Sequence, residues 1–82
     1  MSDTDANTLK QLRALIDGQL LALPDDFPSD GDLYEQGLDS MALMQLILLL
    51  EQEMHVHIVP GDLDKKHFQS LASLVALINS KQ

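Results

Sequence analysis

The chain has 82 residues, 45% of them hydrophobic, which is enough for one small domain with a single core. Its 13 acidic residues outnumber 5 Lys plus Arg, and the net charge of −8 argues against binding to nucleic acid or to anionic membrane surfaces. The absence of cysteine excludes disulfides, zinc–thiolate sites and a thiol nucleophile of the chain's own. No run approaches the ~18 apolar residues of a membrane span. We therefore expect one cytoplasmic, monomeric domain over residues 1–82 that binds partners and is not an enzyme.

The acidic charge is unevenly distributed. Apart from Asp3 and Asp5, every acidic residue lies between Ala14 and Asp64, a stretch without Lys or Arg. An acidic excess keeps small proteins soluble, and a negative face can also steer a basic partner. Charge alone favours solubility as the explanation.

The first expected helix covers residues 4–21. Apolar residues recur there at steps of three and four, at Leu9, Leu12, Ile16 and Leu20, with Leu15 and Leu21 beside them. Thr4 or Asp5 can cap the start of the helix. Gly18 weakens the helical pattern slightly, and Pro24 closes the element.

Residues 24–38 form an expected loop, because two prolines, two glycines and several aspartates interrupt any periodicity. A long loop in so small a domain must be attached to the core. Phe27, Leu33 and Leu38 are its apolar residues and the expected attachment points. A short helical turn is expected over residues 32–36.

The second expected helix covers residues 40–54, with a capping residue supplied by Asp39-Ser40. It is apolar on most sides, and one stripe is formed by Leu43, Leu46, Ile47, Leu50 and Met54. A second flank is formed by Met41, Met44 and Leu48. The pattern is equally compatible with a central buried helix and with an exposed strip that binds a partner, a use to which methionine is suited.

Residues 55–80 contain shorter segments of hydrophobic periodicity. Residues 55–59 alternate, but no second strand is predicted, so we expect a connector with Val56 and Ile58 turned inward. A turn of helix is expected over residues 62–66. The last expected helix, residues 70–80, has an apolar face of Leu71, Leu74, Val75 and Ile78, with Leu77 beside it. The predicted fold class is all-α, a small antiparallel four-helix bundle of three main helices and one short helix.

Several other kinds of site fail on spacing. A nucleophile elbow needs glycine two residues on either side of the serine, which Ser40 lacks. A calcium loop starting at Asp26 would have Pro28 and Gly37 at ligand positions. Two exposed histidines, His55 and His57, without nearby sulfur or carboxylate ligands rarely bind a metal. No metal site is predicted, and a metal buffer is the weakest functional hypothesis.

The segment from Asp32 to Met41 carries a more specific pattern. Gly37, Asp39, Ser40 and Met41 fit a Gly-x-Asp-Ser-aliphatic motif at the start of the second expected helix. In this context the sequence resembles the acyl carrier and peptidyl carrier protein family. The resemblance covers most of the chain and includes the long loop, Glu51-x-Glu53-Met54, Ile58-x-Pro60 and Phe68-x-Ser70-Leu71.

The resemblance implies that 4′-phosphopantetheine is attached to Ser40 by a phosphopantetheinyl transferase. The N-terminus of a helix favours a phosphodiester, because its N–H groups are unpaired and it carries partial positive charge. Gly37 would let the backbone turn into the helix, Leu38 would anchor the loop, and Asp39 would be read by the transferase. The prosthetic group would then supply the thiol that the sequence lacks. As an alternative, Ser40 is a plain helix cap, stabilising the fold by ~1 kcal/mol.

The family also uses the flank of the second helix beside the serine as its docking face. The resemblance therefore favours Met41, Met44 and Leu48 as partner-binding residues, with Glu51 and Glu53 either at the rim or only solvated. The implied partners are an adenylating or acyl-loading enzyme and a condensing enzyme or thioesterase. We expect this docking to depend on apolar contact more than on charge.

Fatty-acid-synthesis carriers usually have acids at the positions of Ala42 and Gln45. Their absence favours a freestanding carrier of an amino acid or unusual acyl group in a dedicated secondary-metabolite pathway, of nonribosomal-peptide or polyketide type. One alternative is a fatty-acid-synthesis acyl carrier protein. Another is a small acidic helical interaction module without a prosthetic group, which would tolerate Ser40→Ala.

Overall fold

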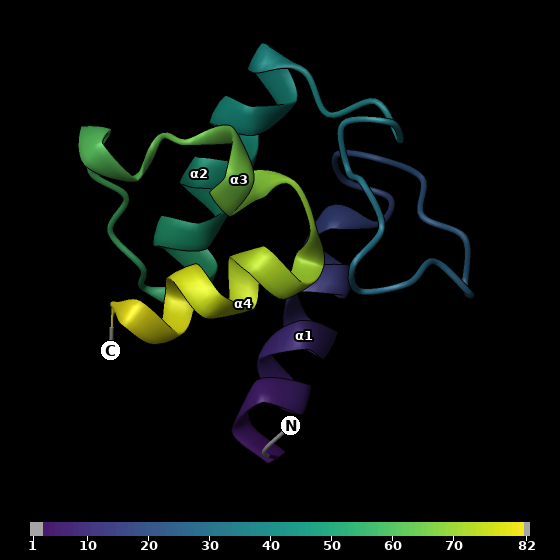
Figure 1. Cartoon of the computed structure of the whole chain (residues 1–82), viewed down its shortest axis with the longest axis horizontal. Coiled ribbons are helices and arrows are strands. Elements are labelled where there is room, and N and C mark those ends of the chain that lie inside the picture. The colour runs from purple at the N-terminus through teal and green to yellow at the C-terminus, as the bar shows by residue number, and fades with distance from the viewer. Residues whose placement is uncertain (1–2, 82) are drawn as a thin grey trace.

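The computed structural model describes residues 3–81, and the side chains from residue 6 onward. It contains four α-helices, α1 (Asp3–Ile16), α2 (Ser40–Met54), α3 (Lys65–Phe68) and α4 (Leu71–Ser80), and a 3₁₀ turn η1 (Pro60–Asp62). Figure 1 shows α1 and α2 running in opposite directions, with α4 crossing them and packing against α1 and α3. The described part has no β-strand beyond an isolated bridge between Asp17 and Leu21, so the all-helical fold class is confirmed. None of its helices has the length and apolar character needed to cross a bilayer.

Helix α1 ends at Ile16, five residues before the predicted end at Leu21. Gly18 adopts a positive φ of 85°, which takes the chain out of the helical path. The Ile16 carbonyl accepts the N–H groups of both Leu20 (3.0 Å) and Leu21 (3.1 Å), and Leu21 is still buried. The turn therefore delivers the same apolar residue to the core without continuing the helix. The side chains of Thr4 and Asp5, the expected caps, lie outside the described part.

The long loop on the right of Figure 1 is attached to the core as predicted. Phe27, Leu33 and Leu38 are all buried. The Leu33 N–H donates to the Gln69 carbonyl at 2.7 Å, which joins the loop to the segment between α3 and α4. Where a short helical turn was predicted over residues 32–36, residues 33–37 form consecutive hydrogen-bonded turns but no helix. The loop thus holds the start of α2 against the rest of the fold.

Val56 and Ile58 of the connector after α2 are buried, as predicted from their alternation. The single helical turn predicted over residues 62–66 is wrong: η1 ends at Asp62 and α3 begins at Lys65. The two turns are separate because Asp64 caps α3, its side chain accepting the Lys66 N–H at 3.1 Å.

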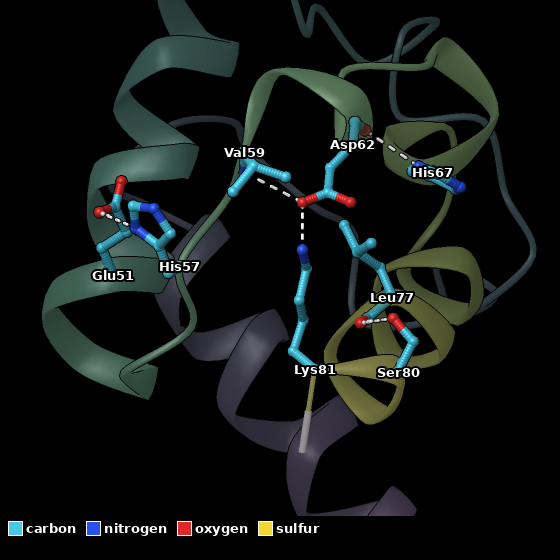
Figure 2. Close-up of polar contacts among 8 residues, drawn as sticks. All are labelled: Glu51, His57, Val59, Asp62, His67, Leu77, Ser80 and Lys81. Carbon is cyan, nitrogen blue, oxygen red and sulfur yellow. Dashed lines mark hydrogen bonds and ion pairs between the residues drawn. The ribbon is translucent and has the colours of Figure 1, made fainter.

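The C-terminal end of α4 is joined to η1 by polar contacts (Figure 2). The Asp62 carboxylate accepts the Val59 N–H at 3.0 Å and pairs with the Lys81 ammonium group. The Asp62 carbonyl oxygen lies 2.9 Å from Nδ1 of His67. Within the 59–81 segment, these contacts hold η1 and α3 beside α4.

Candidate functional site

Helix α2 begins at Ser40, with Asp39 as its N-cap. Asp39 has extended backbone angles, and its Oδ1 accepts the Ala42 N–H at 2.9 Å. The capping role considered for Ser40 is therefore filled by Asp39. Ser40 is exposed, and its hydroxyl has no hydrogen bond within residues 3–81. Its Oγ is accordingly available to a second protein.

The turn before Ser40 is held by backbone hydrogen bonds and by the burial of Leu38. Gly37 has φ of 111°, a region that side chains disfavour, and its N–H donates to the Tyr34 carbonyl at 3.2 Å. Leu38 is buried, and its N–H donates to the Leu33 carbonyl at 3.1 Å. Gly37 thus lets the backbone turn toward α2, and Leu38 anchors the loop in the core, as expected. The chain then reaches the surface at Ser40.

A pocket of about 440 Å³ opens beside Ser40, between α2 and the segment that contains α3. Most of its lining is apolar: Leu43, Met44, Ile47, Leu63 and Phe68, together with Tyr34, Ser40, Asp64 and Lys65. The sequence does not predict this pocket, because its walls come from segments far apart in the chain. The one sequence signal was the apolar character of α2 beyond a single stripe.

The polar side of this pocket is formed by Tyr34, Asp64 and Lys65. The Lys65 ammonium nitrogen lies 5.1 Å from the centre of the Tyr34 ring, the geometry of a cation–π contact. Burial raises the pKa of the Tyr34 hydroxyl, and the negative charges of Asp32 and Asp64 raise it further. Tyr34 therefore stays neutral at physiological pH and presents an aromatic ring to Lys65.

The second flank of α2 is exposed. Met41 is 73% exposed, Met44 67% and Leu48 55%, whereas Leu46 and Leu50 on the core side are fully buried. Leu63 is a further large apolar side chain that is 54% exposed, and no sequence pattern singles it out. We call Met41, Met44 and Leu48 the α2 flank; its exposure is what a partner-binding strip requires.

Glu51 lies one turn beyond the α2 flank and is partly buried, with a carboxylate oxygen 3.4 Å from Nδ1 of the exposed His57 (Figure 2). His55 ends α2 in a left-handed conformation with φ of 56°. Within the described residues, no three His, Cys, Asp or Glu side chains are grouped as metal ligands. The contact between His57 and Glu51 instead joins the connector after α2 to the last turn of the helix.

A protein-family profile described as "Phosphopantetheine attachment site" matches residues 10–78. The chain belongs to this family of carrier domains. Its members attach 4′-phosphopantetheine covalently to a serine, and they are acylated by partner enzymes without being enzymes themselves. This membership places the chain among carriers and not among interaction modules that lack a prosthetic group.

Two solved complexes contain chains of similar structure. One is an engineered Bradyrhizobium japonicum glycine:[carrier protein] ligase complexed with a carrier protein from Agrobacterium tumefaciens and ATP. The matching chain has a TM-score of 0.73 and 26% identity, with 93% of this chain and 97% of that chain covered. The other is the Bradyrhizobium japonicum ligase complexed with a glycylated carrier protein, with a TM-score of 0.69 and 25% identity, covering 93% and 100%. No curated protein matches the sequence.

The residues around Ser40 fit the prosthetic group of the family. The hydroxyl is exposed at the first residue of α2, where backbone N–H groups lack intrahelical partners and favour a phosphate. The pocket beside it offers an apolar wall along which an arm can lie. The arm supplies a terminal thiol for thioester formation.

Proposed function

We propose that Ser40 carries the 4′-phosphopantetheine arm of this chain. The observation that carries the proposal is the unengaged, exposed hydroxyl at the start of α2. Three other serine hydroxyls are hydrogen-bonded locally: Ser70 and Ser73 cap α4 reciprocally at 3.1 Å, and the Ser80 hydroxyl donates to the Leu77 carbonyl at 2.6 Å. In the transfer, Ser40 Oγ loses its proton and bonds to the phosphorus of the coenzyme A phosphopantetheine, while the phosphoanhydride bond breaks and 3′,5′-ADP leaves.

Intact-mass analysis tests the attachment site. After incubation with coenzyme A and a broad-specificity transferase, the wild type should gain the mass of one phosphopantetheine. Ser40→Ala should gain none, while Ser80→Ala, which alters another exposed serine, should be modified like the wild type. Modification of Ser40→Ala, or no mass gain of the wild type with several transferases, would contradict the proposal.

We further propose that the arm is loaded with an amino acid by an ATP-dependent ligase and serves a dedicated biosynthetic pathway. The similarity to carrier proteins in complex with a glycine:[carrier protein] ligase supports this choice of cargo and partner. A condensing enzyme or thioesterase would then take the aminoacyl group from the thiol.

The cargo proposal is tested by incubating the holo protein with such a ligase, ATP and individual amino acids. The expected product is an aminoacyl thioester, detected by mass and released by hydroxylamine. The apo protein is the control and should remain unloaded. Failure of every amino acid, while an acyl-loading enzyme charges the same holo protein, would overturn the aminoacyl assignment.

Carriage of an apolar acyl group, as in fatty-acid synthesis, is a second candidate function. The apolar pocket of about 440 Å³ beside Ser40 favours it, because a glycyl group has no apolar surface to bury there. Transferases can attach either a glycyl or an octanoyl arm from the matching coenzyme A thioester. If octanoyl alone shifts the amide NMR signals of Leu43, Ile47 and Phe68 and raises Tm, the acyl function is favoured.

We propose the α2 flank, rimmed by Glu51, as the docking face for the partner enzymes. Its support is the exposure of Met41 and Met44 on the same helix as Ser40. Met44→Glu should weaken loading at least tenfold while leaving the circular dichroism spectrum unchanged. Gln45→Glu, an exposed neighbour with the same added charge, is the matched control. Equal losses in both variants would show that charge, and not the apolar face, determines docking.

A further inference from the structure

The cation–π pair of Lys65 and Tyr34 lies at the pocket that Ser40 borders. Tyr34 belongs to the turn before α2, and Lys65 is the first residue of α3. The contact therefore holds a positive charge between the two walls of the pocket. Neither residue belongs to the Gly-x-Asp-Ser-aliphatic motif around Ser40, so the motif does not account for this contact.

The charges around this pocket leave Lys65 available for an anion. Among the described residues, Lys65 is the one basic side chain that lines the pocket, and it forms no ion pair with a carboxylate. The neighbouring Lys66 lies 4.0 Å from Asp64, and Lys81 pairs with Asp62. Asp64 also lines the pocket, but its carboxylate accepts the Lys66 N–H and faces the Lys66 ammonium group.

We propose that Lys65, positioned by the ring of Tyr34, binds the phosphodiester of the prosthetic arm and directs the arm along the pocket. The inference rests on the proposed attachment to Ser40, which places one negative phosphate beside the pocket that Lys65 also lines. A lysine ammonium group is a compact point charge that suits a single phosphate oxygen, and no covalent step is involved. The aromatic ring limits the freedom of a side chain that is otherwise flexible. Lys65 is a positioning residue in this scheme.

Phosphorus NMR of the holo protein tests the contact directly. The ³¹P signal of the wild type should move as salt is raised from about 0.1 M to 1 M, where the Debye length falls from about 10 Å to 3 Å. In Lys65→Gln the signal should already lie near the high-salt position and respond little. The ratio of docked to free arm should fall about two- to fivefold, as expected for an exposed ion pair.

Matched variants separate this contact from general effects. Lys66→Gln removes the same charge one residue away and should behave as the wild type, while Lys65→Arg should restore the salt response. Tyr34→Phe keeps the aromatic face and should retain the response, whereas Tyr34→Leu should lose most of it. Backbone NMR spectra of the apo forms check that each variant is folded.

The outcomes also separate this inference from the attachment itself. If intact mass shows that Ser40 of the wild type is not modified, the proposed function fails, and this inference fails with it. If the wild type and Lys65→Gln are both modified and their ³¹P signals respond equally to salt, the Lys65 contact alone is overturned. Equal effects of Lys65→Gln and Lys66→Gln would also overturn it, because they would indicate only a change in net charge.

Discussion

Substitution of Asp39 separates two roles that its side chain combines. Asp39 Oδ1 caps α2 through the Ala42 N–H at 2.9 Å, and its negative charge lies at the positive end of the helix dipole. Asp39 is also the residue expected to be read by the transferase. Asp39→Asn retains a capping oxygen but removes the charge, whereas Asp39→Ala removes both.

The cap geometry of Asp39 allows the size of each effect to be set from general values for helix ends. Loss of an N-cap costs about 0.5–2 kcal/mol, and loss of a favourable charge at an exposed helix end costs about 0.3–1 kcal/mol. Asp39→Ala should therefore lower the free energy of unfolding by about 1–3 kcal/mol, and Asp39→Asn by about 1 kcal/mol or less. For a domain of this size, about 1 kcal/mol corresponds to a Tm decrease of about 4–8 °C. Ser40, which is not the cap, should tolerate Ala with little loss of stability.

Two assays applied to the same variants test these roles. Urea unfolding measures stability, and the initial rate of mass gain measures modification by the transferase. Both variants should be modified at least about tenfold more slowly, since a hydrogen bond to a charged group contributes about 1.5–3 kcal/mol. Asp39→Asn as unstable as Asp39→Ala would refute the capping argument. Modification of Asp39→Asn at the wild-type rate would refute recognition of the carboxylate.

Two further predictions concern the turn before Ser40 and the contact at the end of α4. Gly37→Ala should destabilise the fold by about 1–3 kcal/mol in urea unfolding, because φ of 111° is strained for any residue with a side chain. The strain comes from the backbone, since an added Cβ would meet only ordinary van der Waals contact. Gly61→Ala, at ordinary φ, is the control and should change stability little. The Lys81 hydrogen bond, and then the Val59 N–H, hold the pKa of Asp62 below its ordinary value. This contribution to stability is therefore present above about pH 4 and is lost as pH falls through the lower folded-state pKa. Lys81→Gln should flatten the acid side of the stability profile measured by urea unfolding, and an unchanged slope would contradict the link.

The hydrophobic pattern predicted which residues are buried better than it predicted where helices end. Leu21 satisfies helical spacing and is buried, yet it lies beyond the end of α1. The burial of Leu21 was predicted correctly, because a continued helix and the observed turn after Ile16 both bring this side chain to the core. The spacing of apolar residues cannot distinguish these two conformations. The decisive feature was the positive φ of Gly18, which a sequence pattern permits but does not require.

The site was predicted from local sequence only where its parts are local. Gly37, Leu38, Asp39 and Ser40 are consecutive, and the structure gives each a distinct position in one turn. The choice of Asp39 over Ser40 as cap could not be made from composition, since both residue types cap well. The contact between Tyr34 and Lys65 depends on how α3 packs against the turn before α2, and no local pattern reports such packing.

Helix α2 divides its side chains between the core and the exposed flank that we propose for docking. Leu46 and Leu50 are fully buried, so truncating either to Ala should cost about 2–5 kcal/mol, a large share of the stability of a small domain. Met41 and Met44 are mostly exposed and have little packing to lose, so their substitution should cost well under 1 kcal/mol. Because the two sets share one helix with Ser40, the residues proposed for docking hold a fixed position relative to the hydroxyl while contributing little to the fold. Under the docking proposal, substitution of the exposed residues should therefore change partner binding without unfolding the carrier.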